Sequence, residues 1–302
     1  MFKCFQKRKL LIMLTVVDRL AIAKSPSKIV SENLRSYLLK AMLLKYCTLF
    51  DCPPQIIYQL ISAVAQNDPI PASCLPPDTK IALSKYKEGR YAKRVRSLME
   101  YLENARDLVD IGCGNNRFGK AVIDANPLCR VIGTDVDSDT SFPLQQEPQL
   151  LFSFQSDPTK IELRSKSADL TTLFFVLHHI EYYRQNAILK EAYRILRPAG
   201  TLILFEDSYY KDTFNISQNS GLLSDFYDLS LKDRFTAYAV AEVLNKRALD
   251  GTRMHLVRIY PRPFEVWINM IKKCGFTVNQ ASINLPDEEK CITPIAIAIA
   301  KK

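Results

Sequence analysis

Apolar residues recur through the second half of the chain in short runs separated by glycine, proline and charged residues. Five of these runs are expected as strands, at 108–111, 130–135, 150–157, 168–180 and 201–207. The stretch 181–196 has the length and composition of a helix. Strands that alternate with helices indicate a parallel sheet with crossover connections. The pattern therefore predicts an α/β fold.

The C-terminal region extends this pattern. Apolar residues at 264, 267, 268 and 271 share one helical face, and Gly275 is expected to end that helix. A further strand is expected at 276–281. Isoleucines at 295, 297 and 299 then alternate with alanines at 296, 298 and 300, which is typical of a strand buried on both faces.

Two further segments have no place in a plain alternation of strands and helices. Residues 1–80 contain apolar-rich helix candidates at 29–46 and 56–65, separated and followed by prolines. Residues 208–262 exceed what a crossover needs, and loops after the carboxyl ends of parallel strands build the site in open α/β sheets. We therefore predict an accessory segment at 1–80 and a main domain at 81–302 with an insertion at about 208–262. Both extra segments are expected to wall a ligand pocket, although the first could equally be a packing appendage.

The run Asp110-Ile111-Gly112-Cys113-Gly114 carries the strongest chemical signal, because it places an acid and two glycines where a strand turns into a helix. Glycines allow a sharp turn and close approach of a ligand to the backbone. A dinucleotide fingerprint needs a third glycine at position 117, which is arginine here. An acid before the first glycine would also repel pyrophosphate. The motif thus favours a nucleoside-containing ligand other than a dinucleotide.

Two more carboxylates end the next two strands. Asp135 lies 25 positions after Asp110 and is placed to accept the ribose hydroxyls of a nucleoside bound across the strand tips. Asp157 follows the third strand, where it is placed to accept from an adenine amino group.

In their order, these motifs resemble the class I S-adenosylmethionine-dependent methyltransferases, and within them the type 11 group. The resemblance covers about residues 90–302 and is carried by 110–114, 131–135, 169–180 and Arg197-Pro198-Ala199-Gly200. Ala199 stands where the family more often has glycine. The resemblance implies a Rossmann-like seven-stranded sheet with its last strand antiparallel, here preceded by the N-terminal helical segment.

The resemblance also implies S-adenosylmethionine as cofactor and assigns its contacts. Asp110 would hold the methionine amino group, the two glycines would allow close approach, and Asp135 and Asp157 would contact ribose and adenine. Phe174 and Phe175 would lie under the adenine and methyl region. The predicted cofactor-binding residues are Asp110, Gly112, Cys113, Gly114, Asp135, Val136, Asp157, Phe174 and Phe175.

Catalysis in such a site mainly requires alignment of a nucleophile with the methyl group. A base is needed only if the acceptor carries a proton with a high pKa. His178 and His179, at the end of the fourth predicted strand, are the first candidates, although one of them could be structural. Glu206, Asp207 and Tyr209, at the tip of the fifth strand, are the next candidates.

The net charge of +9 is concentrated before the first strand, where Lys80 to Arg96 hold seven bases and one acid. Such a run could bind RNA, an anionic small molecule or a membrane surface, or form a solvated helix face. The eight cysteines form no C-x-x-C pair, so we expect no metal site and reduced thiols. The apolar run 10–17 is too short for a membrane span or a secretory segment. We expect an ordinary helix there, no transmembrane segment, and a cytoplasmic location.

Three functional hypotheses follow. The first is a methyltransferase that acts on a small or lipid-like acceptor, and the second is one that acts on RNA or protein. The third is a non-catalytic scaffold or binding protein, which would have no need of the intact acids and glycines. The sequence leaves open the acceptor, the use of a base, the oligomeric state and the role of residues 1–80.

Overall fold

The computed structural model describes residues 31–42, 81, 89–137, 147–211, 221–238, 259–284 and 293–302. The helices expected at 10–17 and 56–65 lie outside these residues. The chain divides into two compact units. One combines Met1–Lys85, Ser217–Val257 and Leu285–Pro294, and the other combines Tyr86–Ile216, Arg258–Asn284 and Ile295–Lys302.

The second unit is built on a seven-stranded sheet with the order β3-β2-β1-β4-β5-β7-β6. Its strands are β1 Asp107–Ile111, β2 Arg130–Asp135, β3 Leu150–Phe154, β4 Ala168–Phe174, β5 Leu196–Asp207, β6 Thr277–Asn284 and β7 Ile295–Lys301. The pairs among β1 to β5 are parallel, whereas β7 runs antiparallel to both of its neighbours. The predicted Rossmann-like sheet with an antiparallel last strand is confirmed.

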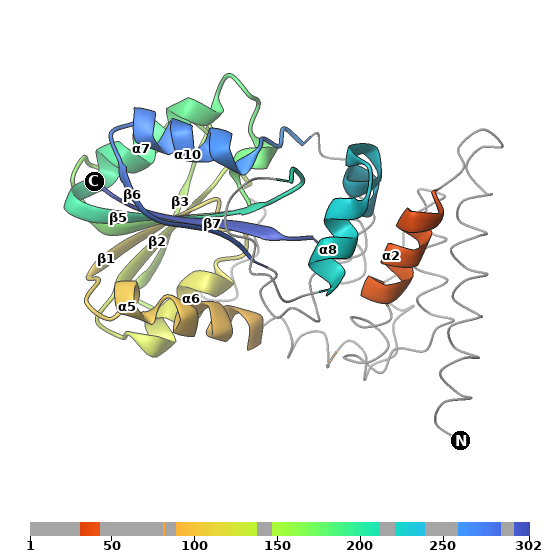
Figure 1. The fold of residues 1–302 in the computed structure, drawn as a ribbon. Coiled ribbons are helices and arrows are strands. Elements are labelled where there is room, and N and C mark those ends of the chain that lie inside the picture. The colour runs from red at the N-terminus through yellow and green to blue at the C-terminus, as the bar shows by residue number, and fades with distance from the viewer. Residues whose placement is uncertain are drawn as a thin grey trace. The chain divides into compact units, whose positions relative to one another are not determined.

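Helices cover both faces of this sheet. The labelled helices of this unit are α5 Met99–Leu102, α6 Arg117–Ala125, α7 Gln185–Ile195 and α10 Phe264–Lys273, and residues 89–97 are also helical. Helices α7 and α10 lie on one face, and α5 and α6 lie on the other (Figure 1). The core therefore consists of two apolar layers, one on each side of the strands.

The C-terminal helix and strand have the buried faces that their apolar spacing predicts. Helix α10 buries Phe264, Trp267, Ile268 and Ile271, the four positions expected on its apolar face. The helix is followed by Gly275 at φ +102°, a left-handed backbone that glycine adopts without strain. Strand β7 lies between β5 and β6, and side chains on both of its faces are buried because helices cover the two sides of the sheet (Figure 1).

Several predicted boundaries differ from the structure, among them the start of β5, which lies at Leu196 instead of 201, and the end of β6, which lies at Asn284 instead of 281. Strand β3 ends at Phe154, and β4 ends at Phe174 instead of continuing to residue 180. The chain then forms the short 3₁₀ helix η3, Leu177–His179, and helix α7 begins at Gln185 instead of 181. Phe175 breaks β4 because its backbone is left-handed, with φ +62°.

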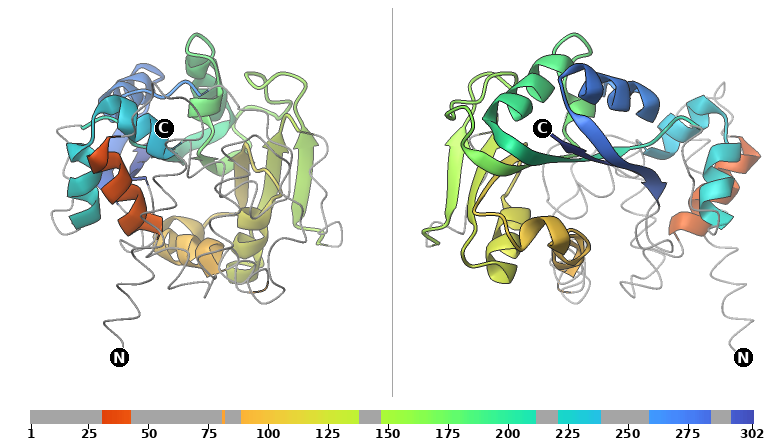
Figure 2. Two further views of the ribbon diagram at one scale, coloured as in Figure 1. Left: turned by 90° about the vertical axis from the view of Figure 1, so that its right-hand side faces the viewer. Right: turned by 60° about the vertical axis from the view of Figure 1, so that its left-hand side comes forward.

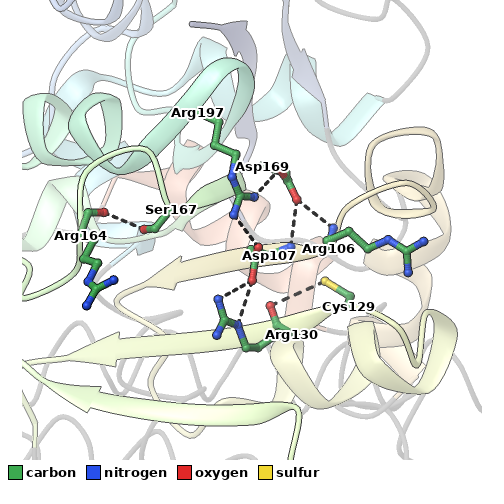
Figure 3. A network of polar contacts seen from close by, with 8 residues as sticks. All are labelled: Arg106, Asp107, Cys129, Arg130, Arg164, Ser167, Asp169 and Arg197. Atoms are coloured by element: carbon green, nitrogen blue, oxygen red, sulfur yellow. Dashed lines mark hydrogen bonds and ion pairs between the residues drawn. The ribbon is translucent and has the colours of Figure 1, made fainter.

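Charged side chains join the amino-terminal ends of four strands (Figure 3). Arg197 lies between Asp107 and Asp169, with its two terminal nitrogens 2.7 Å and 2.5 Å from the carboxylates. Arg130 donates to the second oxygen of Asp107 at 2.8 Å. The other carboxylate oxygen of Asp169, which does not contact Arg197, accepts hydrogen bonds from the backbone N–H groups of Arg106 and Asp107. These contacts fix β1, β2, β4 and β5 together at this edge.

The first unit brings together segments that are far apart in the sequence. Helix α2, Glu32–Met42, packs on helix α8, Gly221–Asp228, as the two views in Figure 2 show. The Tyr37 ring lies 5.5 Å from that of Phe226, and the Lys40 ammonium lies 2.7 Å from the Asp225 carboxylate. The N-terminal segment and the insertion therefore share a core, while a boundary at residue 80 stays a prediction.

Among the described residues, each helix falls short of the length and apolarity needed to cross a bilayer. The same part of the chain holds no group of three or more His, Cys, Asp or Glu side chains arranged to bind a metal ion.

Candidate functional site

The turn between β1 and α6 is a glycine loop in which the two glycines serve different purposes. Gly112 and Gly114 both have left-handed backbones, with φ +72° and +52°. A Cβ atom added at Gly112 would lie 2.4 Å from a methyl carbon of Val176, whereas one added at Gly114 would meet no described atom within 4 Å. Gly112 thus allows close packing inside the protein, and Gly114 leaves an open approach to the backbone.

Asn116 is a site residue that the sequence argument missed. It begins α6 with φ +54°, a left-handed conformation that asparagine tolerates better than most residues. Its side chain is fully buried, and its amide oxygen would lie 2.4 Å and 2.8 Å from Cβ atoms at Gly119 and Gly133. Position 116, rather than 117, therefore takes the third special conformation of the loop. The nearby glycines were the available signal.

Asp135 holds the glycine loop in place. One of its carboxylate oxygens accepts the Gly114 N–H at 2.8 Å, and the other accepts the Asp137 N–H at 3.0 Å. The loop is also fixed to β2, because the N–H groups of Gly112 and Cys113 donate to the Thr134 carbonyl oxygen. Each carboxylate oxygen can accept a second hydrogen bond, so these contacts leave capacity for ligand hydroxyls.

Asp110 is a buried acid at the tip of β1. Its side chain accepts a hydrogen bond from the Thr172 hydroxyl at 2.6 Å. Burial raises the pKa of Asp110 to about 7, although the Thr172 hydrogen bond and the Arg94 charge lower it and the Asp135 charge raises it further. The carboxyl group therefore changes its charge near neutral pH.

Arg94 is the second residue that the sequence argument missed as an individual. It is half-buried, and its guanidinium lies 5.0 Å from the ring centre of Phe174 and 5.3 Å from those of Phe175 and Phe205. It was predicted only as one member of a basic run. Its place beside the strand tips makes it part of the electrostatic environment of Asp110.

The predicted aromatic residues have distinct positions. Phe174 packs between Phe118 and Phe205, with ring centres 4.7 Å and 4.6 Å away. Phe175 is half-buried, and its N–H donates to the Phe205 carbonyl at 2.8 Å. Both rings thus stand at the carboxyl ends of β4 and β5.

The two histidines lie in a turn, not at the end of a strand, within residues 176–182, which we call the histidine loop. Glu206, at the tip of β5, accepts the N–H groups of Val176 and Leu177 at 3.0 Å and 2.6 Å. Its other oxygen lies 2.5 Å from Nδ1 of His178, and both of these side chains are buried. His179 is half-buried, and its ring centre lies 4.1 Å from that of His178.

The remaining predicted residues are spread around the same edge. Asp207 and Tyr209 are buried at and just after the end of β5, while Val136 is half exposed after β2. Burial, together with the charges of Asp110 and Asp135, raises the pKa of the Cys113 thiol, so it stays protonated at neutral pH.

Asp157 already has several partners. One of its oxygens accepts from the backbone and hydroxyl groups of Thr159, both at 2.8 Å, and from Arg184 at 2.5 Å. The Thr159 N–H, followed by its hydroxyl, holds the pKa of Asp157 below its ordinary value. Asp157 stands at the same edge as Asp110 and Asp135, and its contact with a ligand stays a prediction.

Part of the chain matches a known family, and part matches a curated relative. Residues 109–204 match the family described as "Methyltransferase domain". A curated relative, tRNA (carboxymethyluridine(34)-5-O)-methyltransferase of Arabidopsis thaliana, is 27% identical over 123 residues. The match covers 39% of this chain and 29% of that relative's length.

Two solved structures align with most of this chain at low sequence identity. One is a 1,6-didemethyltoxoflavin-N1-methyltransferase of Burkholderia thailandensis with bound S-adenosylhomocysteine, at 14% identity and a TM-score of 0.47. That alignment covers 71% of this chain and 77% of the other. A SAM-dependent methyltransferase from Archaeoglobus fulgidus has 15% identity, a TM-score of 0.47, and coverage of 71% and 94%.

The contrast between the two glycines is testable. We expect Gly114→Ala to cost about 1 kcal/mol of stability from backbone strain alone. Gly112→Ala should cost about 1–3 kcal/mol more, because its methyl group collides with Val176. Urea unfolding of both variants measures the difference.

A double-mutant cycle supplies the control for that comparison. Val176→Ala should recover part of the loss in the Gly112→Ala background and none in the Gly114→Ala background. Equal effects of Val176→Ala in the two backgrounds would show that the predicted collision does not occur.

The raised pKa of Asp110 predicts a pH-dependent change in stability. The folded protein holds the proton up to about pH 7, whereas the unfolded chain releases it near 3.8, so stability falls as the pH rises between these values. Asp110→Asn keeps an acceptor for Thr172 and removes this penalty. At pH 8 we expect it to stabilise the protein by about 2–4 kcal/mol, since one pKa unit is worth about 1.4 kcal/mol. Unfolding of both proteins between pH 4 and 8 checks this, and a variant less stable than wild type at pH 8 would contradict it.

Proposed function

We propose that this chain, whose residues 109–204 match the methyltransferase-domain family, is an S-adenosylmethionine-dependent methyltransferase that transfers a methyl group to a small or lipid-like acceptor. One observation carries the proposal. A buried acid, Asp110, and a loop-holding acid, Asp135, flank a glycine loop whose Gly114 is open to an approaching ligand. A non-catalytic scaffold would need none of these features.

The residues at the strand tips fit the cofactor. Asp110 would hold the methionine ammonium group in its ionised form, and Asp135 would accept the ribose hydroxyls with its remaining lone pairs. Asp157, in the loop after β3, would accept from the adenine amino group. When bound, S-adenosylmethionine supplies a methyl group on a positively charged sulfur, which already makes it electrophilic.

The protein's own contribution is then alignment and exclusion of water. Phe174 and Phe175 provide apolar surface at the carboxyl ends of β4 and β5, where a reacting group would be shielded. We assign His178 and Glu206 to holding the histidine loop, because both are buried and bonded to each other. His179 is the more accessible imidazole and the candidate base for an acceptor that carries a proton. Asp207 and Tyr209 would shape the pocket beside it.

The acceptor would be recognised by the segments outside the sheet. Residues 1–80 and the insertion 208–262 contribute helices α2 and α8, which pack on each other and follow no crossover pattern. These helices form a unit separate from the sheet that holds the predicted cofactor residues, and we assign the choice of a small or lipid-like acceptor to this unit.

A second candidate acceptor is RNA. The relative from Arabidopsis thaliana is described as acting on tRNA. In addition, the helical residues 89–97 expose Arg90, Lys93 and Arg96, and Arg90 lies 5.5 Å from the ring centre of Tyr91. Exposed cations beside aromatic rings suit nucleic acid. A protein acceptor stays open by the same charge argument.

The cofactor assignment predicts selective stabilisation. S-adenosylmethionine and S-adenosylhomocysteine should raise the melting temperature, because they bind only the folded chain, while NAD should not. Asp135→Ala should weaken binding by about 1.5–3 kcal/mol for each hydrogen bond to a charged group that it removes. Calorimetric titration measures the affinity. Equal affinity in wild type and variant would refute the role of Asp135, and a shift by NAD alone would refute the cofactor.

Salt dependence separates the two acceptor classes. If RNA is the acceptor, wild type should bind generic tRNA at low salt, with affinity falling steeply as salt rises. Replacing Arg90, Lys93 and Arg96 together by glutamine should weaken that binding at least tenfold. Absence of binding at low salt would remove the RNA hypothesis and leave the small or lipid-like acceptor.

A further inference from the structure

The histidine loop is hydrogen-bonded on two sides, by a residue just before the insertion and by residues at its end. Glu206, just before the insertion, binds the loop from β5, as described above. On the other side, the Tyr260 N–H donates to the His178 carbonyl oxygen at 2.6 Å. Tyr260 and Arg262 are among the last residues of the insertion predicted at 208–262.

Gln185, the first residue of α7, makes most of the hydrogen bonds on this second side of the histidine loop. Its side chain is fully buried. The amide nitrogen lies 3.0 Å, 2.9 Å and 2.8 Å from the carbonyl oxygens of Leu177, Ile180 and Tyr260. Two of these carbonyls belong to the histidine loop and the third to the end of the insertion. One amide group therefore bonds to both segments.

Arg262 fixes the orientation of that amide. Its Nε donates to the Gln185 side-chain oxygen at 2.6 Å, and because a guanidinium only donates, the amide nitrogen must face the three carbonyls. A second guanidinium nitrogen donates to the Tyr182 carbonyl at 3.1 Å, and the guanidinium lies 4.6 Å from the Tyr182 ring centre. The Tyr182 hydroxyl in turn donates to the Pro261 carbonyl at 3.2 Å.

The histidine loop also contacts the glycine loop. The methyl groups of Val176 fill the space where a Cβ at Gly112 would lie. A single short segment thus touches the predicted cofactor loop at one end and the insertion at the other. Packed interiors transmit displacements because they have few voids.

We propose that Gln185 and Arg262 are positioning residues that couple cofactor binding at the glycine loop to the closing end of the insertion, through the histidine loop. The inference rests on the proposed function, since it takes S-adenosylmethionine or its product as the ligand. It adds that residues 259–262, the closing end of the insertion, are held more firmly when the cofactor site is filled. Cofactor and acceptor would then bind cooperatively.

Hydrogen exchange on the full chain with S-adenosylhomocysteine tests this coupling. In wild type, the ligand should slow exchange of the glycine-loop amides and also of the Tyr260 amide, the latter by about fivefold or more. The Ser167 amide, bonded to the Ile195 carbonyl at the opposite edge, serves as reference for global stabilisation. Arg262→Met should keep the effect at the glycine loop and lose the effect at Tyr260. Gln185→Met should do the same.

Arg194→Met is the matched control. Arg194 is also half-buried, and its guanidinium donates to two backbone carbonyls, those of Leu163 and Ile161, both at 2.8 Å. This variant should retain the ligand effect at Tyr260, whatever its stability.

The outcomes separate the two proposals. Slower exchange at the glycine loop without slower exchange at Tyr260 in wild type overturns the coupling alone. Retention of the Tyr260 effect in both Arg262→Met and Gln185→Met also overturns it. No effect at the glycine loop overturns the proposed function and the coupling with it.

Discussion

The buried carboxylate of Glu206 is the interaction on which the arrangement of the site depends. A charged group inside a protein is tolerated only when hydrogen bonds replace its lost hydration. Glu206 obtains these bonds from Val176, Leu177 and His178. The carboxylate therefore dictates the path of the chain after β4, and with it the contact between Val176 and Gly112. The histidines and the glycine loop share this one constraint.

The stabilising ion pairs and the predicted cofactor residues lie at opposite edges of the sheet. At the amino-terminal edge, charges on adjacent strands neutralise each other, as Asp107 and Asp169 do with Arg197. At the carboxyl edge, among the described residues, neither Asp110 nor Asp135 forms an ion pair with an arginine or lysine side chain within 4 Å, and the Asp135 charge adds to burial in raising the pKa of Asp110. Parallel strands produce this division because all their carboxyl ends meet at one edge.

Much of the fold follows from the sequence because periodicity and turn residues report local conformation. The apolar face of α10 and the isoleucine–alanine alternation of β7 were predicted from spacing alone, and burial confirms both. The motif from Asp110 to Gly114 likewise located the turn between β1 and α6.

The remaining features depend on contacts between distant segments. The apolar run after Phe174 looks like a continuing strand in the sequence. In the structure, the backbone N–H groups of Val176 and Leu177 turn away from the sheet and donate to Glu206, about 30 positions further along the chain. Arg94 was indistinguishable from its basic neighbours until packing placed it over three phenylalanine rings. Asn116 takes a left-handed backbone in a space that two glycines from elsewhere leave open. Such positions are defined by tertiary structure and leave little trace in local pattern.

The charged network at the amino edge has a consequence for how this protein can change over generations. A substitution at Asp107 or Arg197 alters the fraction of folded molecules, and hence cellular abundance, while the chemistry at the far edge keeps its geometry. Under the coupling proposed above, a substitution at Arg262 alters the response of the Tyr260 segment to the cofactor instead. Folded abundance and the response to the cofactor can therefore change independently. A substitution that raises one of them can offset a substitution elsewhere that lowers the other.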